Sequence, residues 1–132
     1  NLAFLNAYKN LEKDSKKIKS IKKYFIKKLT PEFDIKINGC KDESSYTILN
    51  VLFPINISKK PILNFKLDLQ GIACSGGSAC QSGSDKPSHV LSEILGPDLI
   101  KNISVRFSFS KLNSIDEVDK VVNFFKEFIN EN

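Results

Sequence analysis

Apolar side chains recur every three or four positions near both ends of the chain, which is the spacing of one face of an α-helix. In the first segment Lys fills the opposite side, so we expect one long amphipathic helix, ended by Pro31. Its predicted apolar stripe is Phe4, Tyr8, Leu11, Ile18, Ile21, Phe25 and Leu29. Near the other end, Ser114-Ile115-Asp116-Glu117 is a capping box. It predicts a helix with the stripe Ile115, Val118, Val122, Phe125 and Ile129.

Three segments carry the pattern of β-strands. Residues 33 to 37 alternate between apolar and polar side chains and end at the turn dipeptide Asn38-Gly39. Residues 46 to 53 are mostly apolar on both faces, and Pro54 is expected to end this strand. Residues 103 to 110 alternate again, so one face of this strand is predicted to be core and the other polar. The polar positions of this last segment are Ser104, Arg106, Ser108 and Ser110.

A shorter helix and a loop are predicted between the second and third strands. Pro61 suits the first turn of a helix through Leu69, and Gly71 is placed to stop it. Residues 74 to 84 have no apolar period. We expect them to form a loop.

Another short helix is predicted after this loop. Ser84 or Asp85 is expected to cap it, Pro87 to stand at its entry and Gly96-Pro97 to close it. Together the elements predict an α+β fold, a small antiparallel-type sheet of about three to four strands with helices packed on one side.

The chain has 132 residues, enough for one domain with a core of its own. We therefore take residues 1–132 as a single domain. The sequence opens with Asn1 inside a helical pattern and contains no Met. We expect it to be a piece of a longer polypeptide.

Positive charge is concentrated in the first predicted helix. The formal net charge is +5, and nine of the 19 Lys lie in residues 1–28 beside only two acidic residues. An excess confined to one element is more often a solvated helix face than a nucleic-acid footprint, and a single Arg provides little bidentate phosphate chemistry. The sequence predicts no nucleic-acid partner.

No apolar run is long enough to cross a bilayer, and the sequence does not have the pattern of a signal peptide. We therefore expect no membrane association and a cytoplasmic location.

Three Cys in a chain of this size do not form a disulfide framework, and their odd number favours reduced thiols. A metal site made of Cys40, Cys74, Cys80 and His89 has no close ligand spacing, so no metal is predicted. The side chain of His89 is expected either to pack against its neighbours or to place its polar tip in solvent.

Among the segments of the chain, the predicted loop over residues 74 to 84 has the composition that the requirements of folding explain least. Four of the six Gly fall within 13 residues around Cys74 and Cys80. Small neighbours leave the Cys80 sulfur approachable, and a Gly/Ser segment is flexible, which suits a thiol that must move. A plain surface loop with an incidental Cys would have the same composition. The segment lacks the Lys of a phosphate-binding loop and does not match the nucleophile-elbow pattern.

Arg106, the only Arg of the chain, is the second candidate for chemistry. It stands on the polar face of the third predicted strand, between Ser104 and Ser108. A guanidinium holds a carboxylate with two parallel hydrogen bonds, so Arg106 suits the binding of a carboxylate. It could equally form a structural ion pair.

Three segments of the chain resemble a known family. They are Ser-Gly-Gly-Ser-Ala-Cys-Gln-Ser-Gly-Ser at residues 75 to 84, Lys86-Pro87-Ser88-His89-Val90-Leu91, and Ile103-Ser104-Val105-Arg106-Phe107-Ser108. These segments are similar to the C-terminal part of NifS-like, pyridoxal-phosphate-dependent cysteine desulfurases, which belong to the class V aminotransferase family. The resemblance implies the small domain of the type I pyridoxal-phosphate enzyme fold, with the large, cofactor-binding domain absent from this chain.

The resemblance also implies a sulfur-transfer function. L-cysteine would be converted to L-alanine while a persulfide forms on a loop Cys, a reaction that serves iron–sulfur cluster biogenesis. Cys80 matches the nucleophilic Cys of the family, and Arg106 matches the Arg that holds the substrate carboxylate. Pyridoxal phosphate is implied for the full-length enzyme, whereas this chain alone is expected to bind none and to be inactive. The implied partners are L-cysteine, a sulfur-acceptor protein and a second copy in a full-length homodimer.

Two other functions stay open at the level of sequence. The chain could be a non-catalytic binding module that docks an acidic partner through its basic first helix and its loop. It could also be the small domain of a related selenocysteine lyase or aminotransferase. A Cys in a Ser/Gly loop favours the desulfurase over an aminotransferase, which has no use for a mobile thiol.

Overall fold

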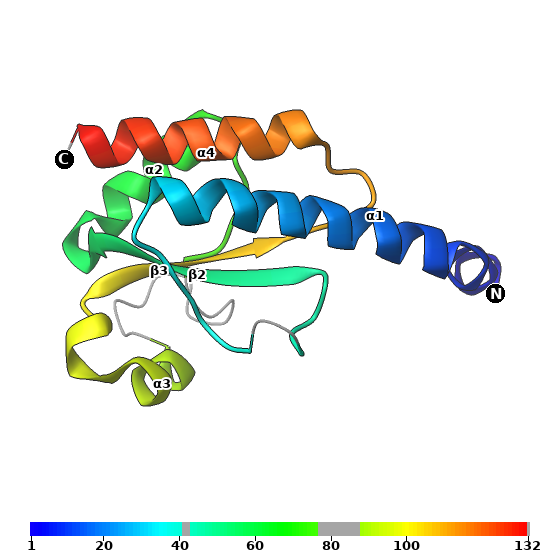
Figure 1. Ribbon diagram of the computed structural model, residues 1–132, viewed down its shortest axis with the longest axis horizontal. Helices are drawn as coiled ribbons and strands as arrows, with labels where there is room; N and C mark the ends of the chain where they lie inside the picture. Colours follow the sequence, from blue (N-terminus) through cyan, green and yellow to red (C-terminus); the bar gives the residue numbers. More distant parts are fainter. Residues whose placement is uncertain (41–42, 77–87, 132) are drawn as a thin grey trace.

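The computed structural model describes residues 1–40, 43–76 and 88–131 (Figure 1). Along the chain its elements are α1 (Leu2–Glu32), β1 (Lys36–Ile37), β2 (Ile48–Asn56), the 3₁₀ turn η1 (Ile57–Lys59), α2 (Lys60–Leu69), α3 (His89–Leu99), β3 (Asn102–Ser108) and α4 (Ile115–Asn130). The predicted α+β class is confirmed. Within the described ranges, no helix is both long enough and apolar enough to cross a membrane.

The described strands form one antiparallel sheet in the order β1-β2-β3. The short β1 reaches only the middle of β2, where Ile37 lies opposite Val51. β2 and β3 pair over most of their length, with Asn50 opposite Arg106. In Figure 1, α1 and α4 lie on one side of this sheet and α3 lies on the other. Because side chains alternate along a strand, the register assigns one face of the sheet to the α1 and α4 side.

Aromatic rings form the centre of the core between the sheet, α1 and α4. The rings of Phe53 and Phe125 stack with their planes 3° apart and their centroids 4.1 Å apart. Phe25 meets Phe107 edge-on at a centroid distance of 4.9 Å. These four side chains come from α1, β2, β3 and α4, and all four are buried. Burying a side chain of this kind stabilises the fold by about 1.5–3 kcal/mol, so the cluster holds both helices on the sheet.

The predicted apolar stripe of α1 is core only in its second half. Phe25 and Leu29 are 2% and 0% exposed, whereas Phe4 and Tyr8 are 70% and 74% exposed. In Figure 1 the first turns of α1 project beyond the sheet and beyond α4. We call this projecting stretch, residues 2–11, the α1 arm. Its exposed large apolar side chains are Leu2, Phe4, Leu5, Tyr8 and Leu11.

Two prolines do not end their elements where the sequence predicted. Pro31 lies inside α1, which ends one residue later, at Glu32. Pro54 lies within β2, so the prediction that it ends this strand is wrong. The pairing of β2 with β3 shifts register between Phe53 and Asn56, and β1 has no partner residue there. Pro54 is tolerated because this irregular stretch does not require its missing N–H.

The start of α3 is set by Ser88, which is the N-cap of the helix. The predicted caps Ser84 and Asp85 lie outside the described residues. Gly96 was expected to close the helix, and its non-helical conformation, with a φ of +73°, interrupts α3 at that residue. A residue without Cβ adopts this left-handed conformation at little cost, so the chain turns here before the helix resumes.

The predicted capping box of α4 is confirmed. The backbone N–H of Glu117 donates to Ser114 Oγ at 3.2 Å, and the backbone N–H of Ser114 donates to Glu117 Oε2 at 3.0 Å. The side-chain amide of Asn113 donates to the same carboxylate oxygen at 3.0 Å. These bonds, that of Asn113 first, hold the pKa of Glu117 below its usual value.

Candidate active site on the polar face of the sheet

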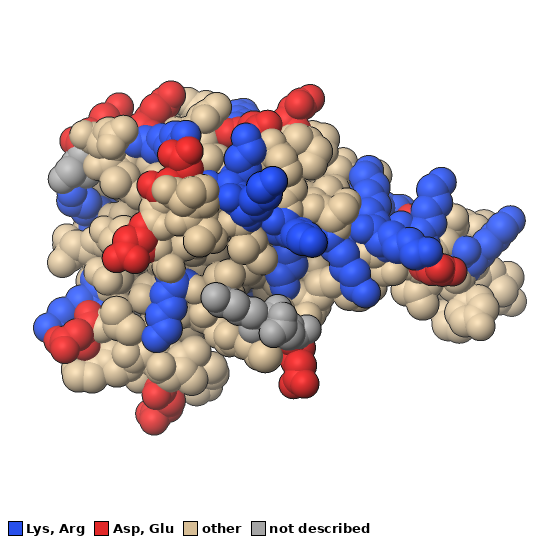
Figure 2. All heavy atoms as spheres, in the orientation of Figure 1, with Lys and Arg blue, Asp and Glu red and all other residues tan. Residues whose placement is uncertain are grey.

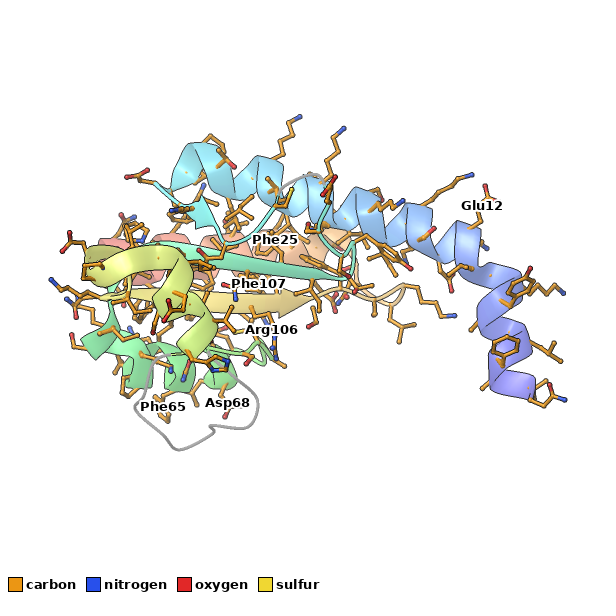
Figure 3. All side chains as sticks on the ribbon, turned by 90° about the horizontal axis from the view of Figure 1, so that it is seen from below. Glu12, Phe25, Phe65, Asp68, Arg106 and Phe107 are labelled. Atoms are coloured by element: carbon orange, nitrogen blue, oxygen red, sulfur yellow. The ribbon has the colours of Figure 1, made fainter. Side chains whose placement is uncertain are left out.

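The candidate site lies on the face of the sheet that points away from α1 and α4. Arg106 on β3 is directly opposite Asn50 on β2, and Ser104 shares their face because it precedes Arg106 by two positions. Phe107, the next residue, points into the core instead. Figure 3 views the molecule from the side on which α3 lies and labels Arg106 on β3. The predicted division of this strand into a core face and a polar face is therefore correct.

The side chain of Arg106 is half-buried. In the part of the chain that the structure describes, none of the ion pairs includes Arg106. The structural ion pair that the sequence left open is thus not found among the described residues. A partly desolvated guanidinium without an anion is suited to bind one, since charge-assisted hydrogen bonds are strongest where water is reduced.

Ser75, at the entry of the predicted loop, is paired with Arg106 through the backbone. The Arg106 N–H donates to the Ser75 carbonyl at 2.7 Å, and the Ser75 N–H donates to the Arg106 carbonyl at 3.1 Å. The sequence predicted a loop from residue 74 and missed this bridge. The segment that leads toward Cys80 therefore starts beside the residue that carries the guanidinium.

The next residue, Gly76, passes close to the start of α2. A Cβ built at this position would stand 3.2 Å from Lys60 Cε and 3.5 Å from Asn64 Oδ1. The distance to Lys60 Cε is tighter than ordinary van der Waals contact, so the flexible end of the Lys60 side chain would have to shift by a few tenths of an ångström for a larger residue. Gly76 thus lies beside the side chains of Lys60 and Asn64.

A group of polar side chains continues the site from Arg106 toward β1. The side-chain amide of Asn38 donates to Asn50 Oδ1 at 3.0 Å and to Ser104 Oγ at 3.1 Å. The backbone N–H of Asn38 also donates to the Asn50 carbonyl at 2.9 Å. Asn38 Oδ1 is buried and has no partner among the described residues. The sequence indicated only a turn at Asn38 and gave no signal for this network.

The predicted nucleophile, Cys80, lies outside the described residues. Cys74 is half-buried, and burial raises the pKa of its thiol to about 11. A thiol with that pKa is almost entirely protonated at neutral pH and is a poor nucleophile. Cys40 is exposed, and so is His89 at the start of α3. Among the described residues, no group of three or more potential metal ligands is assembled.

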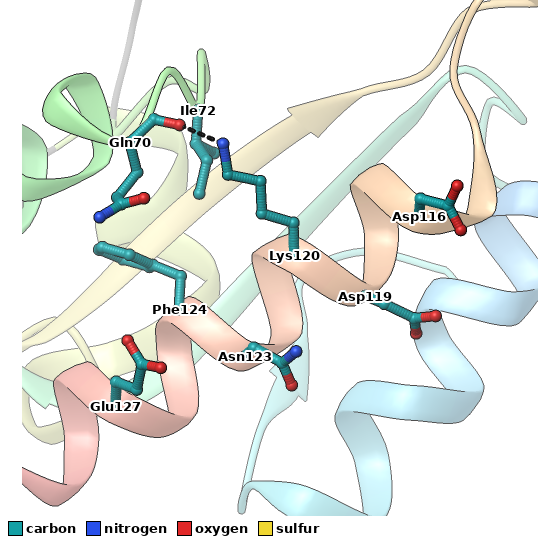
Figure 4. Close-up of a pocket in the computed structure, with 8 residues that line it drawn as sticks. All are labelled: Gln70, Ile72, Asp116, Asp119, Lys120, Asn123, Phe124 and Glu127. Carbon is teal, nitrogen blue, oxygen red and sulfur yellow. Dashed lines mark hydrogen bonds between the residues drawn. The ribbon is translucent and has the colours of Figure 1, made fainter.

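A separate hollow of about 430 Å³ lies where α4 meets the end of α2 (Figure 4). Lys120 crosses it and donates from Nζ to the Gln70 carbonyl at 2.6 Å. Asp116, Asp119 and Glu127 line the α4 side. This hollow contains neither a Cys nor Arg106, so it does not provide the chemistry of the polar face.

The family model of class-V aminotransferases matches residues 1–121, and the chain belongs to this family. Two similar proteins are named as cysteine desulfurases. The chain is 31% identical over 128 residues to cysteine desulfurase IscS of Pseudoalteromonas translucida, covering 96% of this chain and 31% of that protein. It is 32% identical over 124 residues to cysteine desulfurase IscS of Clostridium botulinum, covering 93% of this chain and 31% of that protein. The chain thus spans about a third of the length of these relatives.

A solved structure of a NifS-like protein from Rickettsia africae has the same fold. It superposes with a TM-score of 0.73 at 23% identity, covering 92% of this chain and 31% of that one. The resemblance stated from the sequence motifs is confirmed at the level of family and fold.

Proposed function

We propose that this chain is the Cys-bearing small domain of a pyridoxal-phosphate-dependent cysteine desulfurase, with residues 1–132 as its single domain. The observation that carries the proposal is the backbone pairing of Ser75 with Arg106. Cys80 follows Ser75 by five residues, and five residues span at most about 18 Å. Chain connectivity therefore limits the candidate nucleophile to within about 18 Å of Ser75, which pairs with the residue that carries the guanidinium. The names of the relatives support the same activity.

In the proposed reaction Arg106 binds the carboxylate of L-cysteine with two parallel N–H···O bonds. The Cys80 thiolate then forms a sulfur–sulfur bond with the substrate as the substrate's carbon–sulfur bond breaks. The electron pair of the broken bond stays with the carbon fragment, which takes up protons and leaves as L-alanine. The terminal sulfur of the Cys80 persulfide passes to a sulfur-acceptor protein, and this step serves iron–sulfur cluster biogenesis.

The described residues do not form a setting for the cofactor. Lys22 is the buried Lys among them, and its Nζ already donates to Ser44 Oγ at 2.9 Å and to the Ser45 carbonyl at 2.8 Å. Pyridoxal phosphate would be held by other parts of the full-length enzyme, where it supplies the electron sink for cleavage of the carbon–sulfur bond.

The α1 arm supports the assignment to a larger enzyme. Its apolar side chains continue the stripe that packs in the core, and contiguous apolar surface of this kind is normally covered in a soluble protein. The relatives are about three times as long as this chain. We propose that the arm packs against the large domain of the full-length, cytoplasmic and homodimeric enzyme.

A non-catalytic binding module is the second candidate, and the same arm favours it. Figure 2 shows Lys side chains gathered along the projecting end of the molecule. Exposed apolar groups beside Lys also fit an acidic protein partner. A binding module would dock such a partner but would convert no substrate.

The deciding experiment measures L-alanine formed from L-cysteine by the purified full-length protein loaded with pyridoxal phosphate. The proposal expects one L-alanine for each sulfur released. Transfer of the amino group to a 2-oxo acid would identify an aminotransferase, and activity confined to selenocysteine would identify a lyase. Binding of an acidic partner without any turnover would identify the binding module.

A further inference from the structure

Asn50 is placed to act on the same ligand as Arg106. The two residues are Cα partners in the antiparallel pairing of β2 and β3. Directly opposite side chains in such a pair stand with their Cβ atoms about 4.5–5.5 Å apart on one face of the sheet. An anionic group that the Arg106 guanidinium holds over β2 would therefore lie within reach of the Asn50 side chain.

The orientation of the Asn50 amide is fixed by Asn38. Asn50 Oδ1 accepts from the Asn38 side-chain amide at 3.0 Å, so the oxygen of Asn50 is directed to Asn38. The nitrogen of a planar amide lies on the other side of the group. Among the described residues, Asn50 Nδ2 has no acceptor, and it is not one of their buried unpartnered atoms. Among the described residues, an accessible and unused donor is thereby presented on the face of the sheet that carries Arg106.

The hydrogen bonds of Asn38 with Asn50 and Ser104 are not the arrangement that stability alone would favour. The Asn38 amide nitrogen serves both Asn50 and Ser104, while Asn38 Oδ1 stays buried without a donor among the described residues. A buried acceptor without a partner costs about 1–3 kcal/mol, and most native structures avoid it. Such an arrangement is tolerated where the orientation of a neighbouring group serves a function.

We propose that Asn50 donates a third hydrogen bond to the substrate carboxylate held by Arg106, and that Asn38 is the positioning residue that turns the Asn50 amide toward it. The inference rests on the proposed function, because it takes the carboxylate of L-cysteine as the ligand. It adds a recognition element on β2 to the Arg on β3. The carboxylate is then held from two strands rather than one, which fixes its rotation as well as its position.

The test compares KM and kcat for L-cysteine in the full-length enzyme and its variants. Asn50→Ala should raise KM about tenfold and leave kcat within about twofold, because the lost bond is made in the bound substrate and in the transition state alike. Asn50→Asp should raise KM further, since its carboxylate lies opposite Arg106 and competes for the guanidinium. The inhibition constant of L-alanine should rise in parallel, because the product has the same carboxylate.

Asn38→Asp tests the positioning role without a change to Asn50. An Asp can only accept hydrogen bonds, so it should draw Asn50 Nδ2 toward itself and turn the Asn50 oxygen to the substrate. KM should rise about as much as in Asn50→Ala, and the double variant should be no worse than Asn50→Ala alone. Asn123→Asp is the matched control, because Asn123 is exposed on α4 on the other side of the sheet.

Each outcome has a defined meaning. Unchanged KM in Asn50→Ala and Asn50→Asp, with an active wild type, would overturn the role of Asn50 and leave the proposed function intact. A raised KM in the Asn50 variants with wild-type behaviour of Asn38→Asp would overturn the positioning role. If Asn50→Ala does not fold, the nearly isosteric Asn50→Asp decides. A wild-type enzyme that forms no L-alanine would overturn the proposed function and this inference with it.

Discussion

Arg106 and Ser75 exchange two backbone hydrogen bonds, although they lie far apart in the sequence. The exchange fixes the start of the segment that leads to Cys80 at the centre of β3. The Arg106 side chain itself is directed to the polar face because side chains alternate along β3. The proposed binding of a carboxylate and the proposed delivery of a thiol would thus share one residue of the sheet.

We predict that Arg106→Lys in the full-length enzyme raises KM for L-cysteine without unfolding the protein. Lys keeps the charge but lacks the planar fork that matches a carboxylate, so a loss of roughly 1 to 3 kcal/mol of binding is expected. Steady-state kinetics and thermal denaturation check this together. A large fall in melting temperature with unchanged kinetics would instead assign Arg106 a structural role.

The cysteines of the isolated chain should differ in their rates of alkylation. Burial raises the pKa of Cys74 to about 11, which lowers its thiolate fraction at pH 8 about a hundredfold relative to a thiol of unshifted pKa. The greater nucleophilicity of a more basic thiolate offsets part of this loss of thiolate. We therefore expect Cys74 to react up to about tenfold more slowly than Cys80 and Cys40. Mass spectrometry of tryptic peptides after timed iodoacetamide treatment measures the three rates.

The pH dependence provides the control for this prediction. Raising the pH from 8 to 10 should steadily accelerate the reaction of Cys74, because its pKa of about 11 lies above that window. In denaturant all three thiols should react alike. Equal rates at pH 8 in the folded chain would show that Cys74 is not protected by burial.

The capping box of α4 should contribute to stability in a pH-dependent way. Ser114→Ala removes the acceptor for the Glu117 N–H and should cost about 1 kcal/mol. The pKa of Glu117 is lowered in the folded state, so its contribution is present above the unfolded pKa and is lost as the pH falls through the folded one. Urea unfolding of the wild type and Glu117→Gln at pH 7 and pH 3 should therefore show a difference that shrinks in acid.

Patterns that depend on neighbouring residues were predictable from the sequence. The alternation around Arg106 predicted which side chains of β3 face the core, and the capping box placed the start of α4 correctly. Gly71 stops α2 as expected, with a φ of +66°. Each of these follows from chemistry within a few residues.

Features that depend on distant partners were not predictable. The Gly/Ser segment has no alternation, so nothing in it indicated that Ser75 bridges to β3. The dipeptide Asn38-Gly39 predicted a turn, but the bonds from Asn38 to Asn50 and Ser104 depend on the register of the sheet. Periodicity showed that one side of the α1 arm is apolar, but it contains no information about what covers that side.

The final prediction concerns the residue that carries the sulfur. Cys80→Ser in the full-length enzyme should leave binding of pyridoxal phosphate intact, because we propose that other parts of that enzyme hold the cofactor. It should abolish persulfide formation, because a hydroxyl cannot accept the substrate's sulfur as a thiolate does. Cys74→Ser should keep the activity, since the pKa of about 11 leaves little Cys74 thiolate at neutral pH. Mass spectrometry after incubation with L-cysteine locates the added sulfur, and finding it on Cys74 with Cys80 unmodified would contradict the assignment.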